Sequence, residues 1–586
     1  MKDRCLGCVI IPSSDAHLSE YPAECYKLRE YLSGFTGSEG VLIVGEKRAV
    51  LLVDSRYYIQ AEQQTIATDI HTAPIDKDGT RNQIISSWAM KLCCMMPIGL
   101  FANVTSYADA EEIMLTCEEK GYSVRQLRSE VYEQFWLGER PAFSPSKIFI
   151  HDVKYAGESA KSKISRLRML MQERGVKGLL ISKLEDVAWL LNLRGSDLPD
   201  TPVFYSYLLV CPRKVILYVR KEAMTPEVEE YLESFGVVVD SYENHLKFKR
   251  SDVISFEPHS SAAEVEDKGN NFPYAGPDIV ANMRLIKNET QVSGIRNAML
   301  KDCVALVRML KWLEENKGKG IFETDIADKM IEYRSQMPDY KCESFDTIAG
   351  YADHGAIVHY HAVKGMDYDL KSENIVLIDT GGNYFDGTTD ITRTVSLGAV
   401  TPQQKHDYTL VLKGHIDLAI ARFPNRMTSK MVDVIARKPL AMECLGYGHG
   451  TGHGVGHFLC VHEGPLSFSS DVKLEENMII TDEPGLYREG HHGIRIENMV
   501  RVKKIKENEF GTFLGFEVLT LCPYDYDLID YSLLDKDELL YLEEYTLRVV
   551  SEMERFAQLT PEEMNWLRTK CENGMEKILT ASQGMR

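Results

Sequence analysis

The segment IVLIDTGGNYFDGTTDITR, residues 375–393, predicts a buried strand that runs directly into a carboxylate. Its first four residues are apolar and Asp379 follows at once, although burying an unpaired charge is costly. The second half of the segment predicts a returning strand, and this hairpin would bring Asp379 and Asp390 side by side. Two adjacent carboxylates repel each other unless they share a proton or a cation. An aspartate at a strand end is more often a turn residue, so the pair alone is weak evidence for a site.

A second polar cluster is GHGTGHGVGHF at residues 448–458, followed by VHEGP at 461–465. It is not a dinucleotide-binding loop, because no register gives G-x-G-x-x-G, and it is not a zinc-protease helix, because His462-Glu463 lacks a second histidine at Leu466. Glycines allow neighbouring imidazoles to approach a ligand or metal closely. The alternative is a glycine-rich loop in which the histidines are incidental.

A third cluster consists of two strands that carry glutamates, NMIITDEPG at 477–485 and GIRIENMV at 493–500. The first ends an apolar run with carboxylates. Strand alternation in the second predicts Arg495 and Glu497 on one face and isoleucines on the other. Taken alone, this pattern is equally consistent with a surface strand that carries a salt bridge.

Taken together the clusters are more specific, because they supply four carboxylates and one imidazole. These residues are Asp379, Asp390, His453, Glu483 and Glu497. Two divalent cations would neutralise the four negative charges. Oxygen-rich ligation with one nitrogen suits Mn²⁺ better than a thiolate-seeking ion, and paired metals about 3.5–4 Å apart can activate a nucleophile and polarise a carbonyl.

Length and charge narrow the class of protein. The chain has 586 residues and a net charge of −20, which argues against a general nucleic-acid binder and against docking on anionic lipid. No apolar run reaches the roughly 20 residues that span a bilayer, and the run before Pro12 is too short for a signal-peptide core. The thirteen cysteines are scattered, although Cys5-x-x-Cys8 and Cys93-Cys94 are possible redox or metal pairs, so we expect buried thiols in the cytosol.

The chain divides into three blocks, of which the first two look alike. Residues 41–44 and 49–53 predict a strand pair joined by a polar turn, and residues 207–210 and 215–219 repeat it about 160 residues later. Two chance hairpins could mimic such a duplication. The third block opens with a long amphipathic helix that begins at a capping pair, Asn288 with Gln291.

These motifs closely resemble those of the Xaa-Pro aminopeptidase (aminopeptidase P) family, in its long three-domain cytosolic form. The resemblance in the third block rests on DTGG and GTTDITR within residues 379–393, GHGTGHGVG at 448–456, VHEGP at 461–465, TDEPG at 481–485 and GIRIEN at 493–498. It extends to IPSSDAH at 11–17, GFTGS at 34–38 and NLRGSD at 192–197, so essentially the whole chain is covered.

The resemblance implies a mixed α/β (α+β) chain of three domains. Two creatinase-like domains, residues 1–150 and 151–285, would precede a pita-bread metallopeptidase domain with a C-terminal extension, residues 286–586. The family is dimeric and cytoplasmic, so a homodimer in the cytoplasm is expected.

The resemblance also assigns the metal ligands. They map onto Asp379, Asp390, His453, Glu483 and Glu497, with Asp390 and Glu497 expected to bridge two divalent ions. Mn²⁺ is the favoured ion, with Zn²⁺ and Co²⁺ as alternatives.

Catalytic roles follow in the same way. His359 and His462 would bind the substrate carbonyl and stabilise the tetrahedral oxyanion, and Glu483 would act as general base toward a bridging hydroxide. The expected reaction removes an N-terminal residue from a peptide whose second residue is proline. Because proline has no N–H, the pocket must recognise the shape of the ring.

Three further residues match family positions. Arg495 would steady a metal ligand, His449 lies near the site in the family, and Arg56 matches an arginine associated with peptide binding, although a surface salt bridge would also explain Arg56.

The sequence departs from the family pattern at His457, at Leu486 and at His361-Ala362. We expect these residues at the rim of the pocket, where they would change which peptides bind. Two other functions remain as alternatives. A prolidase would cleave Xaa-Pro dipeptides but usually has a single N-terminal domain, and a pita-bread binding module typically loses metal ligands.

Overall fold

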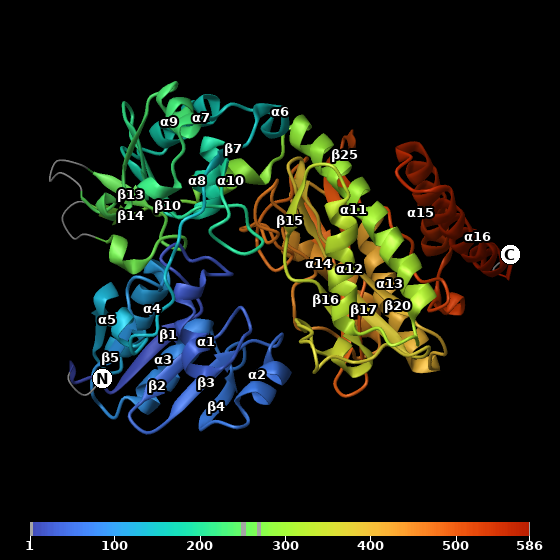
Figure 1. Ribbon diagram of the computed structural model, residues 1–586, viewed down its shortest axis with the longest axis horizontal. Coiled ribbons are helices and arrows are strands. Elements are labelled where there is room, and N and C mark those ends of the chain that lie inside the picture. The colour runs from blue at the N-terminus through green and yellow to red at the C-terminus, as the bar shows by residue number, and fades with distance from the viewer. Residues whose placement is uncertain (1–3, 248–252, 267–270, 585–586) are drawn as a thin grey trace. The chain divides into compact units, whose positions relative to one another are not determined.

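The computed structural model describes residues 4–247, 253–266 and 271–584 (Figure 1). The chain forms two compact units. The first unit comprises Met1–Val153 and Glu158–Asn282, and the second comprises Lys154–Gly157 and Met283–Arg586.

The first unit contains two six-stranded mixed sheets. The first sheet has the order β4-β3-β2-β1-β5-β6. Its strands are β1 (Cys8–Pro12), β2 (Val41–Gly45), β3 (Ala49–Val53), β4 (Ile70–Pro74), β5 (Ile98–Phe101) and β6 (Val124–Leu127). The part of the chain that forms this sheet also contains α1 (Leu28–Ser33), α2 (Tyr58–Thr65), α3 (Arg81–Leu92), α4 (Tyr107–Glu118) and α5 (Ser129–Gln134). Apolar side chains of its central strands are buried on both faces, which explains their nearly continuous hydrophobic sequences.

The second sheet repeats this topology, with the order β12-β11-β10-β8-β13-β14. Its strands are β8 (Leu179–Ile181), β10 (Ser206–Val210), β11 (Val215–Val219), β12 (Val237–Ser241), β13 (Ile254–Phe256) and β14 (Asn271–Pro273), and its helices include α7 (Ala160–Glu173), α8 (Leu184–Leu191) and α9 (Pro226–Glu233). In both sheets an antiparallel hairpin is flanked by parallel strands at corresponding positions. The predicted duplication is therefore confirmed.

The first long helix of the second unit is α11 (Glu289–Asn316), the predicted amphipathic helix. The Asn288 side chain accepts a hydrogen bond from the Gln291 N–H and the Gln291 side chain accepts one from the Asn288 N–H, so the predicted capping box forms. The other long helices are α12 (Glu323–Ser335), α13 (Pro402–Ala419), α14 (Ser429–Met442), α15 (Lys536–Phe556) and α16 (Pro561–Gly584). The last two pack against each other as a helical pair, drawn in red in Figure 1.

The strands of the second unit form small sheets around one hydrophobic core. A three-stranded sheet contains β16 (Ile348–Tyr351), β17 (Ile375–Thr380) and β20 (Ile391–Ser396), and another contains β15 (Tyr340–Glu343), β18 (Gly382–Tyr384) and β19 (Gly387–Thr388). The remaining strands are β21 (Arg422–Pro424), β22 (Ile479–Asp482), β25 (Asn498–Asn508) and β26 (Gly511–Val518) in one sheet, and β23 (Gly485–Arg488) with β24 (His492–Arg495) in a hairpin. The ends of β17, β20, β22 and β24 carry the polar clusters found in the sequence.

Two further observations concern the class of protein. Within the described part of the chain, no helix is both long enough and apolar enough to cross a membrane. All thirteen cysteines lie in described segments and none forms a disulfide, but the expectation of buried thiols is wrong at Cys5, Cys94 and Cys444, which are exposed.

Candidate metal centre

Strands β17 and β20 place the two aspartates next to each other. Asp379 pairs with Thr392 and Thr380 pairs with Ile391, so Asp390, just before β20, lies diagonally across the ladder from Asp379. Burial and the charge of Asp390 raise the pKa of Asp379. The predicted neighbourhood is confirmed, but the connection is not a simple hairpin, because β18 and β19 between them join β15 in a separate sheet.

The glycine-rich loop brings His453 to the edge of β22. The Thr481 N–H donates to the His453 carbonyl at 2.9 Å, and the His453 N–H donates to the Thr481 hydroxyl at 3.0 Å. A side chain at Gly452 would place Cβ only 2.0 Å from the Thr481 carbonyl oxygen. Glycine at this position is therefore needed for the close approach that positions the imidazole.

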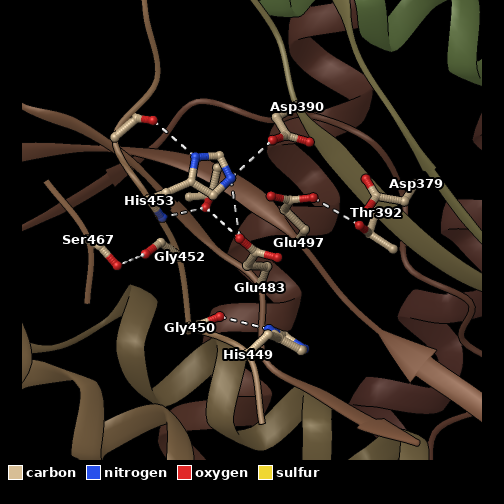
Figure 2. Close-up of polar contacts among 12 residues, drawn as sticks. Asp379, Asp390, Thr392, His449, Gly450, Gly452, His453, Ser467, Glu483 and Glu497 are labelled. Atoms are coloured by element: carbon tan, nitrogen blue, oxygen red, sulfur yellow. Dashed lines mark hydrogen bonds and ion pairs between the residues drawn. The ribbon is translucent and has the colours of Figure 1, made fainter. Parts of the chain in front are cut away.

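The imidazole of His453 faces two carboxylates (Figure 2). Its Nδ1 lies 3.0 Å from the Gly454 carbonyl oxygen, and its Nε2 lies 3.4 Å from Asp390 and 3.3 Å from Glu483. Burial alone would lower the pKa of His453, but the hydrogen bond with Asp390 and the charge of Glu483 raise it to about 9. If a cation took the place of the Nε2 proton, the hydrogen bond from Nδ1 to Gly454 would hold the ring with its Nε2 lone pair toward that cation, as in a metal-binding histidine.

The two glutamates are held by threonine hydroxyls. Thr481 donates to Glu483 Oε1 at 3.1 Å, and Thr392 donates to Glu497 Oε2 at 2.8 Å. Burial and then the charge of Asp390 raise the pKa of Glu483 to about 7, and the same causes raise that of Glu497 well above its usual range. These shifts are the signature of several buried carboxylates that repel each other.

The strand prediction for Glu497 is partly wrong. β24 ends at Arg495 and β25 begins at Asn498, so Glu497 lies between two strands. It still points to the same cluster as Arg495, because both side chains contact the Thr392 hydroxyl.

The cluster has the chemistry of a cation site. Asp390, His453 and Glu497 each offer a ligand atom, and these atoms all lie within 4.8 Å of one another. Asp379 Oδ1 and Glu497 Oε1 are buried and have no hydrogen-bond partner in the segments that the structure describes. Because an unsatisfied buried carboxylate oxygen is costly, divalent cations fit these residues.

A chain of hydrogen bonds links Arg495 and His449 to this cluster. Arg495 donates from Nη2 and Nε to Asp379 Oδ2, at 2.6 and 3.1 Å, and from Nη1 to the Tyr487 hydroxyl at 2.8 Å. The Tyr487 hydroxyl in turn lies 2.7 Å from His449 Nε2. His449 is therefore near the cluster, as expected, and is linked to Arg495 through the Tyr487 hydroxyl.

Sequence reasoning missed Thr392, Thr481 and Tyr487. Strand alternation could have indicated the two threonines, because Thr392 lies two residues after Asp390 and Thr481 two residues before Glu483. Tyr487 gives no such signal, because its contact with Arg495 depends on the pairing of β23 with β24.

The two expected substrate-binding histidines lie near the same cluster. The ring of His462 is 4.3 Å from that of His453, centroid to centroid and nearly perpendicular. His359 follows Val358, whose carbonyl oxygen accepts a hydrogen bond from Arg495 Nη1 at 3.4 Å. Arg56 belongs to the other compact unit, where it forms a two-bond ion pair with Asp54.

The expectation for the rim of the pocket is wrong at two positions. Leu486 belongs to the hydrophobic core, and His457 is buried beside Gly294 of α11. Neither side chain is therefore available to a peptide at an open rim. His361 is exposed, as a rim residue would be.

Comparison with protein families identifies the class. Residues 293–504 match metallopeptidase family M24, and residues 512–574 match the C-terminal region of that peptidase family. Residues 1–129 and 139–291 each match the creatinase/prolidase N-terminal domain. The fold and the site thus define an M24 metallopeptidase domain, of the pita-bread type, preceded by two creatinase-like domains, as the sequence predicts.

Individual relatives narrow this class. The chain is 35% identical to a probable Xaa-Pro aminopeptidase P of Laccaria bicolor, over 97% of this chain and 91% of the relative. It is 35% identical to aminopeptidase P2 of Arabidopsis thaliana, over 92% and 82%. The crystal structure of an X-prolyl aminopeptidase from Caenorhabditis elegans, described as a cytosolic enzyme with a di-nuclear active site, superimposes with a TM-score of 0.91 at 30% identity, over 97% of this chain and 95% of that one. The chain belongs to the Xaa-Pro aminopeptidase family of M24 hydrolases.

Proposed function

We propose that this protein removes the N-terminal residue from peptides whose second residue is proline, using two divalent metal ions. The observation that carries the proposal is the convergence of four carboxylates and His453, with buried oxygens of Asp379 and Glu497 that no other described group satisfies. The names of its full-length relatives support the substrate class.

The metal ligands in this proposal are Asp379, Asp390, His453, Glu483 and Glu497. Divalent cations bound there would act as Lewis acids toward the scissile carbonyl and would lower the pKa of water. Mn²⁺ is the favoured ion because the ligand set is rich in oxygen, and Zn²⁺ and Co²⁺ are the alternatives. Arg495 compensates part of the negative charge at Asp379 and fixes the orientation of its carboxylate.

The chain's own residues then have separate tasks. Glu483 accepts the proton of the attacking water, because its carboxylate belongs to the cluster and is oriented by Thr481. His359 and His462 donate hydrogen bonds to the carbonyl oxygen as negative charge develops on it. His462 is well placed for this, because its ring packs against His453.

Hydrolysis by metal-reconstituted protein tests the proposal. Metal-free protein receives Mn²⁺, Zn²⁺ or Co²⁺ and is assayed with an Xaa-Pro-Yaa tripeptide, the matching Xaa-Ala-Yaa tripeptide and the Xaa-Pro dipeptide. We expect release of the first residue from the proline tripeptide alone, with two ions bound per chain, and no release by Asp390→Asn. Cleavage of the dipeptide only would identify a prolidase. Absence of both metal binding and hydrolysis would identify a binding module.

Four further points belong to the same proposal. The division into domains at 1–150, 151–285 and 286–586 is supported by the two repeated sheets and by the family matches. A cytoplasmic location is supported by the absence of disulfides among the described cysteines and by the relative described as cytosolic. We propose a homodimer, which light scattering would test, and a peptide-binding role for Arg56, for which Arg56→Ala should raise KM.

A further inference from the structure

The segment that carries His359 has little regular structure of its own. Between β16 and β17, residues 352–374, all described by the structure, contain one short 3₁₀ turn, η6 (Ala352–Ala356), and no strand. Backbone hydrogen bonds inside the segment close only local turns, such as Tyr360 N–H to the Ile357 carbonyl. The position of His359 must therefore be fixed by contacts with other elements.

One of these contacts is made by Glu323, the first residue of α12. Its side chain is fully buried, and its carboxylate accepts hydrogen bonds from four donors in the segment and its flank. The donors are Tyr351 N–H at 2.7 Å, His354 Nδ1 at 2.9 Å, the Tyr360 hydroxyl at 2.9 Å and Tyr368 N–H at 2.9 Å. A single carboxylate thus joins the beginning, the middle and the far end of the segment.

Ring contacts strengthen the same arrangement. The imidazole of His354 stacks on Tyr368, with centroids 3.7 Å apart and planes 11° apart, and contacts Tyr360 at 4.4 Å. The four donors, together with the N-terminal end of α12, compensate the burial of a negative charge. Four donors converging on one buried acceptor form an ordered network rather than a surface ion pair.

The opposite side of the segment is held by the metal cluster. The Val358 carbonyl oxygen accepts from Arg495, which also binds Asp379. The η6 turn packs against β24 so closely that a Cβ at Gly493 would lie 1.7 Å from the Gly355 carbonyl oxygen. The two neighbours of His359 are therefore both tethered, Val358 to the metal cluster and Tyr360 to Glu323.

We propose that Glu323 is a positioning residue for the hydrolysis reaction, which fixes His359 against the scissile carbonyl through Tyr360 and His354. The inference rests on the proposed function, in which His359 contacts the substrate's carbonyl oxygen. Glu323 is not among the proposed metal ligands or substrate-binding residues. It matters because an oxyanion donor is effective only within a narrow range of distance and angle.

The test compares single and double variants of the full-length, metal-loaded protein. Glu323→Gln keeps the shape of the side chain but replaces one acceptor oxygen by a donor, and Tyr360→Phe removes a single hydroxyl. His359→Ala should lower kcat about 100-fold, the usual effect of losing one oxyanion donor. Glu332→Gln, at an exposed position of the same helix, is the matched control.

We expect Glu323→Gln to lower kcat about tenfold, with KM changed less than about threefold and two metal ions still bound. In the His359→Ala background the same substitution should change kcat less than about twofold, because its effect passes through His359. Tyr360→Phe should also lower kcat, by a smaller factor, and should have almost no effect in the His359→Ala background. This variant tests the proposal if Glu323→Gln does not fold.

Different failures have different meanings. An equal loss from Glu323→Gln in both backgrounds, or a loss of bound metal, would show that Glu323 supports the whole site rather than His359, and would overturn the inference. An unchanged kcat in Glu323→Gln and Tyr360→Phe would overturn it as well. Wild-type protein that binds metal but cleaves no Xaa-Pro peptide would instead refute the proposed function itself.

Discussion

Replacement of Arg495 by lysine separates the charge of this residue from its shape. The guanidinium contacts Asp379 through Nε and Nη2 and the Tyr487 hydroxyl through Nη1. Lysine keeps the positive charge beside Asp379, but a single ammonium nitrogen cannot take the place of three separate nitrogens. Arg495→Lys should therefore weaken the hydrogen-bond network and leave the formal charge of the cluster unchanged.

The size of the effect follows from the contacts that are lost. Arg495 is buried, and a hydrogen bond that involves a charged group contributes about 1.5–3 kcal/mol. Lysine can retain one bond to Asp379 and loses the bond to Tyr487, so the free energy of unfolding of the metal-free protein should fall by about 2 kcal/mol. Replacement of a residue that hydrogen-bonds to a metal ligand typically weakens metal affinity 10–100-fold. The dissociation constant for Mn²⁺ should therefore rise about 30-fold.

Two measurements check this prediction. Urea unfolding of the metal-free protein gives the stability change, and competition with a chelator gives the dissociation constant for Mn²⁺. Arg501→Lys is a suitable control, because Arg501 lies on β25, the next strand along the chain, and pairs with the half-buried Glu517 at 2.9 Å. It should leave metal affinity unchanged.

Unaltered metal affinity in Arg495→Lys would refute the reasoning, since it would mean that charge alone organises Asp379. Equal losses in Arg495→Lys and Arg501→Lys would refute it too, because the effect would then be a general response to replacing an arginine in this part of the chain.

Other substitutions test separate features. His453→Ala should reduce bound metal below two ions per chain and abolish hydrolysis of Xaa-Pro-Yaa peptides, and retention of both ions by metal analysis would contradict the ligand assignment. Although burial alone would raise the pKa of Asp407, Arg488 and His492 hold it well below its usual range. The difference in free energy of unfolding between wild type and Asp407→Asn should thus be fully present above about pH 4 and should shrink as the pH falls further. A difference in urea unfolding that does not change with pH would argue against this ion pair. Asn288→Ala removes the capping box of α11 and should cost about 1 kcal/mol in the same assay, whereas an unchanged midpoint would show that the cap contributes nothing.

Much of the site could be predicted because its residues occupy positions with strong local signals. Asp379 ends an apolar run that folds into the fully buried strand β17, and His453 lies among glycines that the close approach to Thr481 requires. Strand alternation would also have identified Thr392. These signals are short-range, since they depend on burial and on chain geometry within a few residues.

Other features could not be predicted, because they depend on contacts between distant segments. Glu323 reads as an ordinary acidic residue in the first turn of a helix, yet its four donors come from residues 28 to 45 positions later in the chain. Leu486 was expected at a rim and is in the core, because its neighbours are fixed by the pairing of β23 with β24. Sequence spacing carries no information on which face of such a hairpin is covered.

The sequence by itself determined which residues could form a metal centre, the duplicated N-terminal architecture and the family. Periodicity, glycine spacing and carboxylates at strand ends are properties of the local chain, and they can be recognised without knowledge of the packing. Only the tertiary structure decided which distant residues surround the centre: Arg495 between Asp379 and Tyr487, the threonines that donate to the glutamates, and Glu323 against Tyr360, the neighbour of His359. The physical reason is that a buried charge requires hydrogen bonds or an opposite charge to compensate for lost hydration, and the groups that supply them lie on other elements.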